Sequence, residues 1–168
     1  MRAAKVTLLI LSLIALSVFQ VINRMTVNPT TSSGNGNPAL LLGAVLIPIF
    51  ILMVLLWVRV LRVHSVKIRT SLLGLLAISI HLVIAFKYHK HVLNQYREFI
   101  KNAFIEKSGT VDLQYVESIT SFLGIHVNNQ YFNLNTFFMF LTFSIFIAFA
   151  YHLWDLVEEK NNATNSRH

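Results

Sequence analysis

The sequence contains no cysteine. This absence excludes disulfide bridges, thiolate metal ligands, iron–sulfur clusters and a cysteine nucleophile. Acidic residues are also few, with 7 Asp and Glu against 14 Lys and Arg, and none falls inside the apolar stretches described below. Because proton-coupled carriers normally keep a carboxylate within the membrane, the sequence does not favour that class of transporter.

Charged residues of both signs make up only 12% of the chain, whereas hydrophobic residues make up 55%. This composition is typical of a polytopic membrane protein. In a soluble protein, the net charge of +7 would indicate a nucleic-acid partner. Here the basic residues flank apolar segments, where membrane topology and anionic lipid explain them, so we expect no nucleic-acid partner.

Four apolar stretches contain no Lys, Arg, Asp or Glu and are long enough to cross a bilayer as helices: residues 6–23, 25–58, 70–86 and 118–154. We therefore predict an all-α fold, an integral membrane four-helix bundle that forms one membrane domain over residues 1–168. The expected spans are residues 6–22, 39–58, 70–88 and 132–154. We expect a flexible connector at 24–38, a kink at Pro48 and a disordered polar tail at about 156–168.

The third span is expected to continue into water as one long helix. Residues 70–107 contain no proline, and Ser108-Gly109-Thr110 ends the pattern. Residues 111–123 predict a short amphipathic extramembrane helix, capped by Thr110 or Asp112, that lies either on the membrane or against the long helix. Together these segments form an extracytoplasmic helical cap over about 89–124.

Small residues indicate where helices pack closely. The last span carries Ser144, Ala148 and His152 at intervals of four, so they share one face. The expected partner is one face of the long helix, which continues beyond the membrane towards contacts with a partner or lipid. This face comprises Gly74, Ala77, His81, Ala85, Val92, Tyr96 and Phe99, with Lys101 beside it.

His81 falls near the middle of the third span, where an ionisable group is a candidate for function. We predict a neutral imidazole that is hydrogen-bonded to Ser144, Thr142 or a backbone carbonyl. A bis-histidine haem would need a second histidine at the same depth, and none fits that position. A metal site is a weak alternative because His89 and His91 point apart on a helix. Its other ligands would be His126, Asp112 and Glu117.

The connector between the second and third spans carries four cations, which predicts that it is cytoplasmic. These cations are Arg59, Arg62, Lys67 and Arg69. The N-terminus and the C-terminus would then also be cytoplasmic. The first span follows Arg2 and Lys5, so it is either a membrane anchor or the core of a signal peptide over residues 1–17.

These features lead us to expect a cell-membrane protein that acts as a non-catalytic accessory subunit, with no cofactor. Its partners would be membrane lipid and another membrane protein, or a second copy of itself. One alternative is an oligomeric channel or transporter lined by Ser79, His81 and Thr142. The other is a haem- or metal-binding membrane enzyme. Serines near His126 lack the signature of a nucleophile elbow.

Overall fold

The computed structural model describes residues 2–31, 36–122 and 124–165. It is 84% helical, and no strand occurs within these residues. The long helices are α1 (Arg2–Arg24), α3 (Leu46–Val63), α4 (Ile68–Ser108) and α7 (Leu134–Asn165). Shorter helices are α2 (Ala39–Ala44), α5 (Leu113–Ile119), a 3₁₀ turn (Ile125–Val127) and α6 (Asn128–Tyr131).

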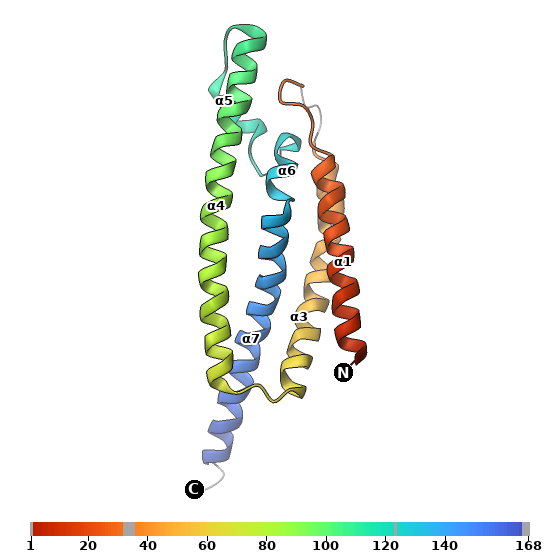
Figure 1. The fold of residues 1–168 in the computed structure, drawn as a ribbon, viewed down its shortest axis with the longest axis vertical. Coiled ribbons are helices and arrows are strands. Elements are labelled where there is room, and N and C mark those ends of the chain that lie inside the picture. The colour runs from red at the N-terminus through yellow and green to blue at the C-terminus, as the bar shows by residue number, and fades with distance from the viewer. Residues whose placement is uncertain (1, 32–35, 123, 166–168) are drawn as a thin grey trace.

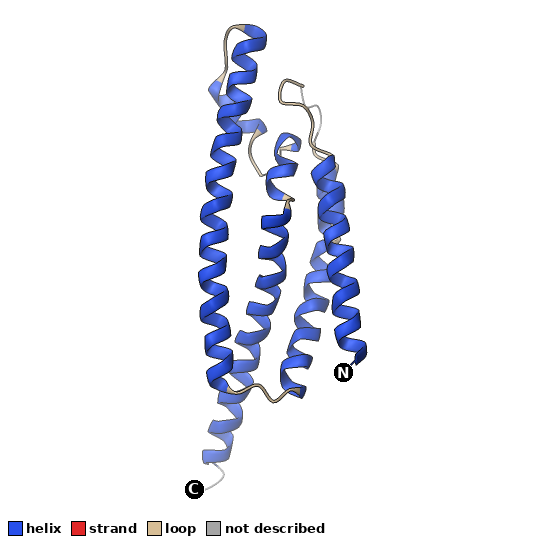
Figure 2. Cartoon of the chain, in the orientation of Figure 1, coloured by secondary structure: helices blue, strands red, loops and turns tan. Residues whose placement is uncertain are grey.

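Four helical segments are long and apolar enough to cross a membrane, with α2 and α3 counting as one of them. They confirm the predicted all-α four-helix bundle. Figure 1 shows that α1 begins and α7 ends at the same end of the bundle, which we call the terminal end. At the opposite end, the cap end, α4 extends beyond the other helices and α5 lies beside it (Figure 2).

Helix α7 occupies the centre of the bundle, because it packs against both α3 and α4. Its phenylalanines are distributed around the helix, as their spacing predicts, so they face several neighbours. Phe19 of α1 lies 5.4 Å from Phe132 and 5.7 Å from Phe137, measured between ring centroids. Phe50 of α3 lies 5.4 Å from Phe140. Aromatic contacts therefore join α7 to α1 and α3.

The predicted kink near Pro48 is present as a break between α2 and α3 at Val45. Proline lacks an N–H group, and its ring clashes with the carbonyl four residues earlier, which here belongs to Ala44. The backbone N–H of Val45 instead donates to the carbonyl of Leu42, three residues earlier, at 3.1 Å. The proline therefore disturbs the turn before it.

Helix α4 runs without a break for 41 residues. At 1.5 Å per residue it spans about 60 Å, twice the thickness of a bilayer's hydrocarbon core. It ends at Gly109, whose backbone is left-handed (φ 73°) and whose N–H donates to the carbonyl of Ile105. The prediction of one continuous helix that outlasts the membrane is confirmed.

The polar tail differs from the expectation of disorder from about residue 156, since α7 continues to Asn165. Extending an existing helix requires no new nucleus, and Glu158, Glu159 and Lys160 are good helix formers. The carboxylate of Asp155 also pairs with Arg62 at 2.7 Å. Residues 166–168 lie outside the described part of the chain.

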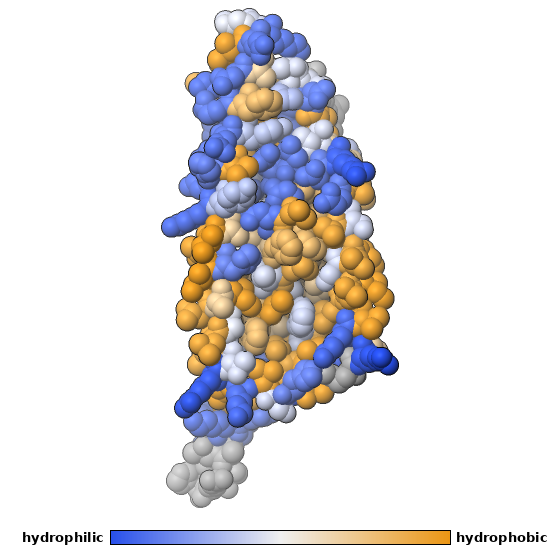
Figure 3. Space-filling view, in the orientation of Figure 1, coloured by the Kyte–Doolittle hydropathy of each residue, from blue (hydrophilic) through white to orange (hydrophobic). Residues whose placement is uncertain are grey.

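The surface has the polarity of a membrane protein. Figure 3 shows a broad apolar belt around the middle of the visible face, with hydrophilic side chains gathered towards the terminal end and the cap end. Within the belt, many large apolar side chains of the four long segments are exposed, such as Leu9, Leu55, Leu73 and Phe138. This architecture fits a small multi-pass membrane protein, whose apolar side chains lie exposed in a belt.

Candidate functional site

Helices α4 and α7 are in close contact at Gly74. A Cβ atom at this position would lie 2.8 Å from Cε2 of Phe149, so glycine permits the ring to lie directly on the backbone of α4. Further along, Ala85 is buried, and its carbonyl accepts a hydrogen bond from Nδ2 of Asn135 at 3.1 Å. Two residues of the predicted packing face, Gly74 and Ala85, thus do lie against α7.

The small-residue face of α7 meets a different neighbour from the one expected. Ser144, Ala148 and His152 are all buried, but Ala148 packs with Val58 and Leu61 of α3. Because α7 lies between α3 and α4, different faces of α7 pack against different helices. Close packing at Ala148 therefore joins α7 to α3.

The predicted hydrogen bond of His81 is wrong. Its Nε2 atom is buried and has no hydrogen-bond partner among the described residues. The hydroxyl of Ser144 donates to the carbonyl of Leu141 at 2.7 Å, and that of Thr142 to the carbonyl of Phe138 at 2.8 Å. Serine and threonine in helices often donate to their own preceding turn in this way, and neither hydroxyl is bonded to Nε2 of His81.

The predicted stripe of α4 divides into two faces. One side is buried at Ser71, Ala85, Leu93 and Ile100, and Val92 and Tyr96 lie half-buried at its margin. Beside it runs an exposed strip whose residues recur at alternating intervals of seven and four, which keeps them in line on a helix. We call it the free face; it comprises Ala77, Ile84, Tyr88, Gln95 and Phe99.

The cap is a small hydrophobic cluster formed by α5 and the cap end of α4. Ile100, Val116 and Ile119 are buried together, with Tyr96 and Phe104 packed around them. This packing decides between the two predicted positions of the amphipathic helix: it lies against α4. The predicted Asp112 cap is confirmed, since its carboxylate accepts from the backbone N–H groups of residues 114 and 115.

Polar contacts hold the cap in register. Nε of Arg97 donates to the hydroxyl of Thr120 at 3.2 Å, across the junction of α4 and α5. Lys101, a predicted contact residue, pairs with Glu98 at 3.2 Å on the surface of α4. Helix α5 is shorter than the predicted 111–123 helix, since it spans Leu113–Ile119, and its first residue, Leu113, is exposed. Residue 123 lies outside the described residues.

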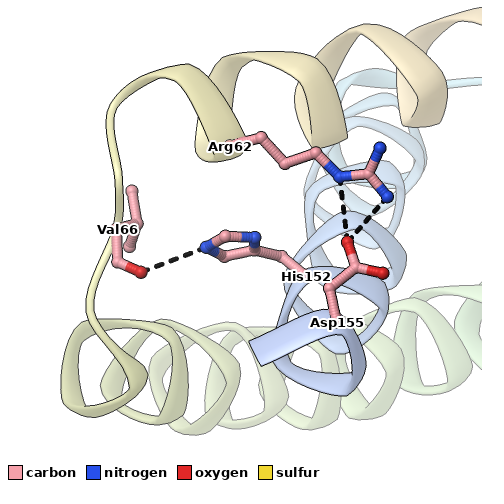
Figure 4. Close-up of polar contacts among 4 residues, drawn as sticks. All are labelled: Arg62, Val66, His152 and Asp155. Atoms are coloured by element: carbon pink, nitrogen blue, oxygen red, sulfur yellow. Dashed lines mark hydrogen bonds and ion pairs between the residues drawn. The ribbon is translucent and has the colours of Figure 1, made fainter. Parts of the chain in front are cut away.

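At the terminal end, two polar contacts join α7 to α3 and to the connector before α4 (Figure 4). Arg62 pairs with Asp155 at 2.7 Å, and Nε2 of the buried His152 lies 3.1 Å from the carbonyl of Val66. A cavity of about 970 Å³ adjoins them. It is lined by Arg62, Lys67 and Arg69 but also by Asp155, Glu158 and Glu159, so charges of both signs share it.

The alternative metal site is not assembled. Within the described residues, no three His, Asp or Glu side chains come close enough together to hold a metal ion. His126 is buried, with Nε2 at 2.9 Å from the carbonyl of Thr31. His89 packs on the ring of Tyr131, and the carboxylate of Asp112 is occupied by the α5 cap.

The sequence reasoning missed a polar network at the cap end. Nδ2 of Asn37 donates to Oδ1 of Asn128 at 2.7 Å, and both side chains are buried. Asn23 donates to the carbonyl of Phe132 at 2.8 Å. The connector at 24–38, expected to be flexible, is thus held at its two ends, and its residues 32–35 lie outside the described part of the chain. The available signal was the run of amides at 128–130 following His126.

Comparison with protein-family models, with curated proteins and with solved structures found no match to this chain. The class of the protein therefore rests on its own fold and surface. Its described residues have the architecture of a small all-α membrane protein, with four segments long and apolar enough to span a membrane and one helix that projects from the bundle and carries a cap.

Proposed function

We propose that this protein is a non-catalytic subunit that binds another membrane protein along the free face of α4. The observation that carries the proposal is the continuity of this face: exposed residues stay in line from the apolar belt into the cap. Ile84 is 63% exposed, Tyr88 58% and Phe99 56%. Phe99 lies 11 residues beyond Tyr88, or about 16 Å further along the axis.

The length of the free face restricts the kind of partner that can cover it. Lipid covers Ala77 and Ile84 but does not reach Phe99, which lies beyond Lys90 in the hydrophilic part of α4. A soluble protein could cover Phe99 but not Ala77. A membrane-spanning helix that continues past the surface is the partner that matches both parts, with the small side chain of Ala77 allowing close approach.

The predicted contact residues fit this arrangement in different ways. Phe99 would touch the partner directly. Val92 and Tyr96 lie half-buried beside the cap cluster and support the helix beneath it. Lys101 would remain at the rim, where its surface ion pair with Glu98 adds little stability.

Site-specific photocrosslinking in native membranes tests the proposal. A photoreactive phenylalanine at Ile84 and one at Phe99 should each form an adduct with the same polypeptide. The matched control is Ile105, an exposed apolar residue of the cap that lies about 120° around α4 from Phe99. The proposal fails if positions 84 and 99 share no adduct, if position 105 gives the same adduct, or if the adduct is a second copy of this chain.

A substitution then tests the membrane part of the face. Ala77→Leu should lower the yield of the shared adduct by about fivefold or more, since overfilling a close helix contact costs about 1–3 kcal/mol. Ala150→Leu, the same change at an exposed position of α7, should leave the yield unchanged. Equal yields from both variants would contradict a contact at Ala77.

A further inference from the structure

An apolar groove of about 800 Å³ lies on α7 between α4 and α1, on a side of α4 away from the free face. Its lining is rich in aromatic rings, with Phe86 from α4, Phe19 from α1, and Phe132, Phe140 and Phe143 from the α7 side. Phe86 is 58% exposed and Phe143 44%. The groove is therefore open to whatever surrounds the apolar belt.

The charged side chains that line the groove lie at one end of it, and all of them are positive. Lys87 and Lys90 line it, and none of the described lining residues is acidic. The two lysines follow Leu82, Val83 and Phe86 along α4, so they lie at the cap end while the apolar wall points towards the middle of the bundle. Both lysines are exposed, which leaves their ammonium groups available to a ligand.

This order of apolar wall and cations matches an amphiphile in the adjacent leaflet. Its chain would lie along the phenylalanines of α7, and its head would sit at the surface beside two cations. Ammonium groups bind phosphate oxygens through charge-assisted hydrogen bonds. A volume of about 800 Å³ is within the usual range for sites that enclose small ligands.

We propose that the groove binds one anionic phospholipid of the cap-side leaflet, with an acyl chain against α7 and its phosphate between Lys87 and Lys90. The lysines, not the apolar wall, would provide the selectivity, because every phospholipid offers a similar chain. A cation near an anionic lipid surface contributes about fivefold in affinity, or about 1 kcal/mol. Loss of both lysines should therefore lower the affinity about 30-fold.

Native mass spectrometry of the detergent-solubilised full chain tests the headgroup. The purified protein is titrated with dioleoylphosphatidylglycerol or with dioleoylphosphatidylcholine, and the first bound lipid is quantified. The wild type should bind the phosphatidylglycerol at least tenfold more tightly than the phosphatidylcholine. Lys87→Gln/Lys90→Gln should abolish this preference, whereas Lys5→Gln/Lys67→Gln, with the same change in charge at exposed positions of the terminal end, should keep it.

A second variant tests the groove itself. Val83→Trp places a large ring into the groove wall and should reduce retention of the anionic lipid, although both lysines remain. Ile80→Trp, at a similarly exposed position of α4 that does not line the groove, should have no effect. Equal retention of the two lipids by the wild type would overturn the proposal. The proposal would also be overturned if the charge-matched control lost the preference for the anionic lipid to the same extent. Preferential binding of oleate over the phospholipid would overturn it too.

Discussion

Gly74 is the point at which a missing side chain allows α4 and Phe149 of α7 to meet. We expect Gly74→Leu to destabilise the protein by about 1–3 kcal/mol, because the ring and the new side chain would occupy the same space. Ala77→Leu is the matched control, since Ala77 lies three residues along on the free face and should leave stability unchanged. Thermal unfolding in detergent measures both. Equal stability of the two variants would show that α4 and α7 do not meet at Gly74.

Predictions for single residues were right where the interaction is local in sequence. They were wrong where the interaction depends on a residue from a distant segment. Asp112 was identified from its position before an apolar repeat, and its bonds to the next turn require no distant residue. The sequence could not show that the buried Nε2 of His81 has no hydrogen-bond partner among the described residues, because this depends on which side chains the neighbouring helix brings close to it. The burial of Asn37 and Asn128 likewise depends on bringing two distant segments together.

Helix α5 is short, and its N-terminal cap is expected to contribute much of its local stability. Asp112→Ala should cost about 1 kcal/mol and speed hydrogen exchange at the amides of Gln114 and Tyr115 about fivefold. Glu117→Ala is the control, since this exposed acid lies on α5 outside its first turn. Unchanged exchange in the Asp112 variant would contradict the cap.

Among the elements, the sequence predicted the four apolar segments, the break before Pro48 and the unbroken α4. Each of these follows from composition, from a missing N–H group or from the absence of a helix breaker. The side of α4 that packs could not be fixed from small residues alone, and Ala77 lies on the exposed side. The persistence of α7 to Asn165 was missed because a polar composition does not by itself end a helix already begun.

At the scale of the whole molecule, α7 is the central helix and α4 is the one that departs from the bundle. The two surfaces proposed to bind other molecules both belong to α4, on different sides of it. The groove faces α1, and the free face lies on the opposite flank of the strip of α4 that contacts α7. A partner helix and a bound lipid can therefore occupy α4 at the same time.

The placement of both termini at one end agrees with an even number of membrane crossings. The direction of insertion remains a prediction from the four cations of the connector between α3 and α4. It places the terminal end in the cytoplasm and the cap outside. The sequon at Asn162 would then stay unglycosylated in microsomes, because it lies at the terminal end.

The continuity of α4 underlies both proposals, and one distance measures it. Because the chain has no native cysteine, spin labels can be attached at Leu73→Cys and Glu106→Cys alone, and both positions are exposed. They are 33 residues apart, so an unbroken helix predicts a narrow distribution centred at about 50 Å. A broad distribution, or one centred well below that distance, would show that α4 bends or breaks between the membrane and the cap.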